Sequence, residues 1–198
     1  NMITEKLDLF PLRCVLIKDF LSPDEIVQFE TAVQLYNVEG PNSNTGMCIK
    51  KDYRDNYDKN LYFFYDKVKE QVVENYNLHI EVREAIYNHM NLNEIVPNHL
   101  HTTKSHWDIA GLRNICVLTA CYYTNSGEGF AKLKINHPQP MGVLIGEDAQ
   151  FLLEPTPNSL LLFPSWVNHG TTLHGSNITR KCLVLEMVLG KNPGVHKL

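Results

Sequence analysis

The sequence predicts a mainly β fold with flanking α-helices, in which the N-terminal helices cover a sandwich or barrel. Two observations predict this class. Apolar residues recur at helical spacing in the first 80 residues, and from about Val82 onward short apolar runs alternate with Gly, Pro or Asn. Helices followed by many short strands are typical of this architecture. We expect one domain over residues 1–198, with helical support over about 1–80 and a β core over about 81–190.

Two helices are expected in the N-terminal part. The first follows a short strand, with Ser22 as N-cap, Pro23 in the first helical position and Glu25 completing a capping box. A polar loop over 37–46 leads toward the second helix, expected over 60–78. The apolar faces of the two helices, which we expect to cover a sheet, consist of Ile26, Phe29 and Val33, and of Leu61, Tyr65, Val68 and Val72.

The C-terminal part contains the strand candidates. Their spacing and the turn residues between them are typical of an all-β core. The candidates cover 83–95, 115–123, 131–135, 142–146, 149–154, 159–164 and 181–189.

Composition and charge exclude several classes. The net charge is −4 and the pI is near 6.1, which argues against duplex DNA as a partner because DNA binding usually needs a clustered basic surface. No apolar run is long enough for a membrane span, and the first ten residues show no secretory signal. The five cysteines form no CxxC pair, which favours a reducing, cytoplasmic location. Because no apolar run is long enough for a span, we expect no membrane partner.

The clearest chemical motif is His106-Trp107-Asp108. Residues two apart in a strand point to the same face, so this imidazole and carboxylate can reach one metal ion together. With His169 on a later strand they would complete two histidines and one carboxylate, the ligand set of non-haem Fe(II) sites. Arg180, at the start of an apolar strand, extends the pattern.

This combination resembles the Fe(II)/2-oxoglutarate-dependent oxygenases, particularly the prolyl-4-hydroxylase-like branch with its bacterial and phage members. The resemblance covers roughly Tyr87 to Leu189 and includes the Tyr-Tyr strand "RNICVLTACYYTN" and the hairpin "SGEGF". It implies a double-stranded β-helix core, the cupin-like jelly roll. The hairpin departs from the family's usual double glycine, and the eleven residues from His169 to Arg180 make a long interval.

The resemblance also implies the roles of individual residues. His106, Asp108 and His169 would bind Fe(II). Arg180 would pair with the distal carboxylate of 2-oxoglutarate, to which the Tyr123 hydroxyl would also donate; an arginine suits this task because its planar fork binds a carboxylate bidentately. Three cofactor-binding candidates result: Arg180, Tyr123 and Thr119, the last because it lies on the same strand face as Tyr123.

Other histidines compete for the metal. His99 and His101 are also two residues apart, and with His169 they would form a three-histidine site without a carboxylate, as in cupin-like proteins. The shorter chain distance from Asp108 to the Tyr-Tyr strand favours the first pair. His174 lies only six residues before Arg180, too close for the expected ligand, and we expect it either in the loop or beside the metal ligands without binding the metal itself.

One buried acid has no partner that the sequence names. Glu186 shares the inward face with Arg180 by strand alternation and would need a counter-charge there.

The implied activity is hydroxylation of an organic substrate, using Fe(II), 2-oxoglutarate and dioxygen, with ascorbate as a reductant that the resemblance allows. A prolyl or other amino-acid side chain in a peptide or protein is the favoured substrate; a small molecule or a nucleic-acid base is the alternative. Two alternative hypotheses are a cupin-like metal-binding protein without oxygenase activity and an inactive interaction domain. The sequence predicts no oligomeric state.

Overall fold

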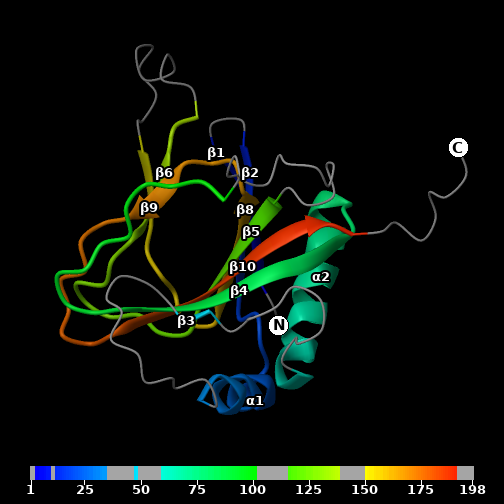
Figure 1. The fold of residues 1–198 in the computed structure, drawn as a ribbon, viewed down its shortest axis with the longest axis horizontal. Coiled ribbons are helices and arrows are strands. Elements are labelled where there is room, and N and C mark those ends of the chain that lie inside the picture. Colours follow the sequence, from blue (N-terminus) through cyan, green and yellow to red (C-terminus); the bar gives the residue numbers. More distant parts are fainter. Residues whose placement is uncertain are drawn as a thin grey trace, which may run out of the picture.

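The computed structural model describes residues 3–9, 12–34, 47–48, 59–101, 116–138 and 150–190. Within these residues the chain forms two antiparallel sheets (Figure 1). The strands of the large sheet are β1 (Ile3–Leu9), β2 (Leu12–Lys18), β3 (Met47–Cys48), β4 (Ile80–Met90), β5 (Cys116–Tyr123), β8 (Ser159–Pro164) and β10 (Arg180–Leu189). The small sheet consists of β6 (Leu133–Asn136), β7 (Gln150–Leu153) and β9 (His169–Thr171). The strand orders are β1-β2-β8-β5-β10-β4-β3 and β7-β6-β9.

The two faces of the large sheet belong to two different cores. On β5, Leu118, Ala120 and Tyr122 point toward the helices, whereas Cys121 and Tyr123 point toward the small sheet. This alternation is the period of two that a strand imposes on its side chains. The sequence therefore builds a helix-covered sheet whose opposite face forms a jelly-roll interior, which confirms the predicted fold class.

The helices lie on the outer face of the large sheet, as Figure 1 shows. They are α1 (Pro23–Gln34) and α2 (Tyr62–Tyr76), the latter preceded by a short 3-10 turn, η1 (Lys59–Leu61). The capping box before α1 forms as predicted: the Ser22 backbone N–H donates to Glu25, and the Glu25 N–H donates to the Ser22 hydroxyl. None of the described helices combines the length and apolar character that crossing a membrane would require.

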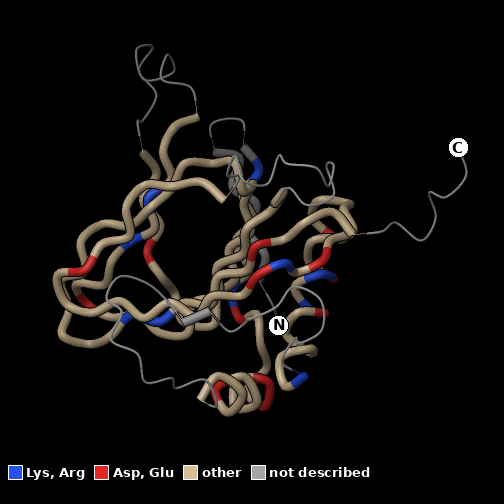
Figure 2. Tube along the Cα trace, viewed as in Figure 1, with Lys and Arg blue, Asp and Glu red and all other residues tan. Residues whose placement is uncertain are grey.

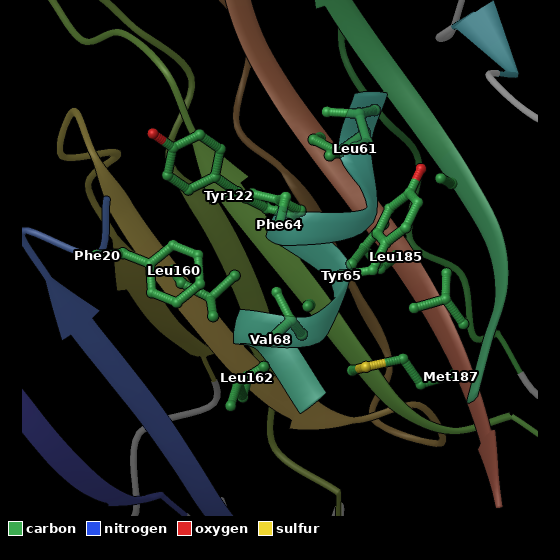
Figure 3. Close-up of a cluster of buried hydrophobic side chains, with 14 of the residues drawn as sticks. Phe20, Leu61, Phe64, Tyr65, Val68, Tyr122, Leu160, Leu162, Leu185 and Met187 are labelled. Atoms are coloured by element: carbon green, nitrogen blue, oxygen red, sulfur yellow. The ribbon is translucent and has the colours of Figure 1, made fainter. Parts of the chain in front are cut away.

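Aromatic packing joins the helices to the sheet (Figure 3). The Phe64 ring of α2 lies 5.7 Å from Phe20, 5.1 Å from Phe29 and 5.1 Å from Tyr122 between ring centroids. These tilted and edge-to-face contacts are favourable beyond the apolar area that they bury. This packing covers the outer face of β5 and β10, the two central strands that carry much of the site.

Some expected elements differ from those observed. The strand expected over 83–95 is β4, which begins at Ile80 and ends at Met90, because Asn93 adopts a positive φ in the turn that follows. The pair β1 and β2 extends the large sheet within a region expected to be mainly helical. The loop over 37–46 and the strand expected over 142–146 lie outside the described residues.

Candidate metal centre and cavity

A cavity of about 470 Å³ opens between the two sheets. Its floor is the inner face of β4, β5 and β10, and part of its rim is the segment 96–101 that follows β4. Most of its lining is apolar and comes from Ile86, Val96, Pro97, Leu100, Leu133 and Val184. Polar groups gather at two places in it: a histidine cluster with Glu186, and Arg180 with Tyr123.

The histidine cluster begins with a backbone pairing between distant parts of the chain. His99 and His169 exchange both backbone hydrogen bonds, at 2.8 and 3.0 Å, and so extend the small sheet by one short bridge. Gly170 permits this approach, because a Cβ at that position would lie 2.8 Å from the Val96 carbonyl oxygen. His101 then follows two residues after His99 and its ring enters the same cavity.

Hydrogen bonds fix the tautomers of the three rings. The Nδ1 of His99 lies 2.8 Å from the Pro97 carbonyl oxygen, and that of His169 lies 2.8 Å from the Val167 carbonyl oxygen. A carbonyl oxygen only accepts, so both Nδ1 atoms carry the proton. The His101 Nδ1 donates to Glu186 Oε1 at 2.6 Å. Burial lowers the pKa of His99 and of His169, so these two neutral rings keep a lone pair on Nε2.

The three rings meet in one place. One ring nitrogen from each of His99, His101 and His169 lies within 4.8 Å of the other two, and the Nε2 atoms of His101 and His169 are 3.1 Å apart. Two nitrogens bound at right angles to one metal ion at ~2.1 Å each would lie about 3 Å apart. Burial lowers the pKa of His169 to about 3, helped by the two neighbouring histidines, so the ring stays neutral near pH 7. The donor set fits a divalent transition metal.

Glu186 is the buried partner of His101. Its other oxygen accepts from Arg83 at 2.9 Å and from the Cys116 thiol at 3.3 Å. Burial acts to raise the pKa of this carboxyl, but the hydrogen bond from His101 and the nearby Arg83 outweigh it and hold the pKa below its usual value. The carboxylate is therefore ionised beside the cluster, and the partners that the sequence could not name are the Arg83 cation and the His101 N–H.

Arg180 and Tyr123 form the second polar group. Both side chains are buried, and the guanidinium carbon lies 5.2 Å from the centre of the Tyr123 ring. Within the described part of the chain, the Arg180 Nε and the Tyr123 hydroxyl have no hydrogen-bond partner. A guanidinium N–H and a hydroxyl that are buried without partners cost free energy unless an acceptor such as an anion binds them. Their position in the cavity therefore fits the carboxylate of a small molecule.

Two other predicted residues have structural partners. The Thr119 hydroxyl is 2.9 Å from that of Ser165, and Thr119 is not among the residues that line the cavity. Ser165 in turn accepts the His101 backbone N–H at 3.1 Å, so Thr119 supports the histidine cluster indirectly. Both ring nitrogens of His174 are occupied, one by the Ala131 N–H and the other by the Ile178 carbonyl, which agrees with its exclusion as a ligand.

One of the three predicted ligands lies within the described residues, and two lie outside them. His169 lies in the cluster. His106 and Asp108 lie outside the described residues, so their part in metal binding stays a prediction. The structure brings His99 and His101, the pair that the sequence offered as the rival, to His169. A sequence signal for it exists, the two-residue spacing of His99 and His101, but the bridge to His169 that distinguishes it is a long-range contact.

Comparison with known proteins supports the assignment of the fold. The sequence matches no protein-family model and no curated protein. Among solved structures, the chain is similar to an oxidoreductase of the 2OG-Fe(II) oxygenase family from Burkholderia pseudomallei (TM-score 0.67, 12% identity, 88% of this chain and 84% of that one). It is also similar to a Pseudomonas putida prolyl-4-hydroxylase (TM-score 0.60, 14% identity, 92% and 96%).

A third similar structure is HygX from Streptomyces hygroscopicus, which was solved with nickel and 2-oxoglutarate bound (TM-score 0.62, 10% identity, 90% of this chain and 83% of that one). The three likenesses span most of each chain. The chain therefore has the double-stranded β-helix fold of the Fe(II)/2-oxoglutarate-dependent oxygenases.

Proposed function

We propose that the chain is an Fe(II)- and 2-oxoglutarate-dependent oxygenase with its metal at His99, His101 and His169. The observation that carries the proposal is the pairing of two incomplete sites in one cavity. Ring nitrogens of three histidines lie within 4.8 Å of one another, and in the same cavity the Arg180 Nε and the Tyr123 hydroxyl have no hydrogen-bond partner among the described residues. A metal ion satisfies the first group, and the carboxylate of a keto acid satisfies the second.

The layout of β10 accounts for the distance between the two groups. Arg180 and Glu186 lie on the same face of this strand, six residues apart, which corresponds to ~20 Å of backbone. Both side chains and the His101 ring line the same cavity. Cys182 and Val184 form the floor between them. A small dicarboxylate bound by Arg180 at one end would therefore have its other end directed toward the histidines.

The chain's own residues hold and orient the reactants. Arg180 binds the distal carboxylate, to which Tyr123 donates its hydroxyl proton, while the apolar walls exclude water from the remaining space. When bound, Fe(II), 2-oxoglutarate and dioxygen supply the oxidising chemistry that hydroxylates a substrate C–H group. The protein itself orients the reactants and excludes water from the site.

For the substrate we propose a prolyl or other amino-acid side chain in a peptide or protein, with a small apolar molecule as the alternative. The apolar lining supports an uncharged reacting group, and one structural neighbour is a prolyl-4-hydroxylase. Lys and Arg are interspersed with Asp and Glu along the described trace (Figure 2), an arrangement that does not favour nucleic acid.

The three-histidine cluster also supports a second candidate, a cupin-like metal protein that does not use 2-oxoglutarate. Arg180 separates the two. An oxygenase of the proposed class needs this cation for its cosubstrate, whereas a metal protein of the second class does not.

The direct test is optical. Adding 2-oxoglutarate to the protein with anaerobic Fe(II) should give the weak visible charge-transfer band of a chelated complex, and Arg180→Gln should abolish the band at the same 2-oxoglutarate concentration. A peptide panel assayed for succinate release then identifies the substrate. Metal binding without the band would favour the second candidate.

A further inference from the structure

Glu186 lies in the cavity beside the histidine cluster without being one of its candidate ligands. It is 8% exposed, and its two oxygens accept hydrogen bonds from three different strands or segments: His101 at 2.6 Å, Arg83 at 2.9 Å and Cys116 at 3.3 Å. Such an ionised and fully bonded carboxylate costs free energy to bury, so its retention calls for a function.

Two β-bulges build the surroundings of Glu186. Between β10 and β4 the register shifts after the Glu186–Glu84 pair, which leaves Arg83 as an extra residue. Between β10 and β5 it shifts after the Met187–Leu118 pair, which leaves Val117 extra. Each bulge reverses the alternation of side chains, so that Arg83 and Cys116 point toward Glu186 and not toward the helices.

From this arrangement we propose that Glu186 is a positioning residue of the metal centre, acting through His101. The inference rests on the proposed metal site. Its hydrogen bond holds the proton of His101 on Nδ1 and directs the Nε2 lone pair toward the Nε2 of His169. Arg83 and Cys116 fix the carboxylate in turn, so the ring of His101 has one orientation.

The charge of Glu186 has a second effect. Three neutral imidazoles bring no negative charge to a divalent metal, unlike a ligand set with a carboxylate. Glu186 places a carboxylate on the side of the His101 ring opposite the proposed metal, and this makes the His101 Nε2 a more basic metal ligand. The site thus gains the charge of an acidic ligand while keeping three nitrogens at the metal.

The test is a double-mutant cycle on Co(II) affinity, measured by calorimetry on the metal-free protein with Glu186→Gln, His101→Ala and the double variant. Loss of a carboxylate that supports a metal-binding histidine typically weakens metal binding about 10–100-fold. We expect that decrease for Glu186→Gln when His101 is present, and no further decrease when His101 is alanine. Glu81→Gln, an exposed change of the same kind on β4, should leave Co(II) affinity unchanged.

Folding effects are separated by two further variants. Arg83→Gln removes the ion pair but keeps the carboxylate on His101. It should therefore lower the melting temperature, but weaken Co(II) binding less than Glu186→Gln does. Glu186→Asp keeps the charge but shortens its reach, and serves where Glu186→Gln does not fold; it too should weaken Co(II) binding.

Equal Co(II) affinity in wild type and Glu186→Gln would overturn the inference, as would the same decrease with and without His101. A wild-type protein that binds no Co(II), or a His169→Ala variant that binds it as tightly as wild type, would instead overturn the proposed metal site itself.

Discussion

His101 and His169 face each other through their Nε2 atoms at 3.1 Å, and the His169 Nε2 carries no proton, because its Nδ1 donates to the Val167 carbonyl oxygen. Two nitrogens at that distance need a proton or a metal ion between them, because two lone pairs would repel each other. The backbone holds them in this relationship, because His169 pairs with His99 and the His101 N–H is bonded to Ser165. The fold therefore holds these two nitrogens in an arrangement that a bound metal ion would stabilise.

The close packing at Gly170 gives the first prediction. Gly170→Ala should displace the segment 96–98, since the added Cβ would meet the Val96 carbonyl oxygen at 2.8 Å and the Asn98 side chain at 2.7 Å. We expect the His99–His169 bridge to open and Co(II) affinity to fall at least about 10-fold. Gly175→Ala is the matched control, because its Cβ would meet only the Gly129 oxygen, at 3.5 Å. Unchanged Co(II) binding in Gly170→Ala would show that the bridge does not shape the site.

The second prediction concerns the geometry of Arg180. Arg180→Lys keeps the positive charge but loses the planar fork, so 2-oxoglutarate affinity should fall about 10-fold or more; a hydrogen bond between charged groups contributes about 1.5–3 kcal/mol. Titration of the Fe(II) protein under anaerobic conditions measures it. Lys181→Gln, next in the chain, should bind 2-oxoglutarate as wild type does. Equal affinity in Arg180→Lys would mean that the cosubstrate is anchored elsewhere.

The third prediction tests whether Thr119 stabilises the fold or binds 2-oxoglutarate, using Thr119→Val. It removes the partner of the buried Ser165 hydroxyl, so the free energy of unfolding should fall by about 1–3 kcal/mol with little change in 2-oxoglutarate affinity. Denaturant unfolding gives the first quantity, and Thr31→Val, on the exposed face of α1, is the control. A large loss of 2-oxoglutarate affinity at unchanged stability would instead place Thr119 in the cosubstrate site.

The fourth prediction tests the backing of the sheet. Phe64→Ala should destabilise the protein by about 3–5 kcal/mol, because a fully buried ring that contacts Phe20, Phe29 and Tyr122 leaves a cavity. Val73→Ala, on the exposed side of the same helix, should change stability by no more than about 0.5 kcal/mol. Denaturant melts compare them; similar effects of the two variants would contradict the packing described.

Local rules predicted the parts of the fold that depend on neighbours in the chain. The capping box at Ser22 and Glu25 formed, and strand alternation placed Tyr123 in the cavity and Tyr122 in the helix-covered core. The same alternation put Arg180 and Glu186 on one face, because no bulge interrupts β10 between them.

The rest depends on contacts that no local pattern encodes. Chain distance favoured His106 and Asp108, which lie outside the described residues, and it could not show that His99 and His101 meet His169, because the bridge at His99 is a long-range contact. Alternation also fails at the bulges, so the sequence could not pair Arg83 with Glu186.

The most direct test of the proposed metal centre compares two ligand sets in one titration. Co(II) is added to the metal-free wild type and to His101→Ala and Asp108→Ala, with binding followed by calorimetry and folding checked by circular dichroism. The proposed three-histidine centre predicts one site in the wild type, a large loss of affinity in His101→Ala, and wild-type affinity in Asp108→Ala. Loss in Asp108→Ala with full binding in His101→Ala would contradict it and restore the ligand set with Asp108.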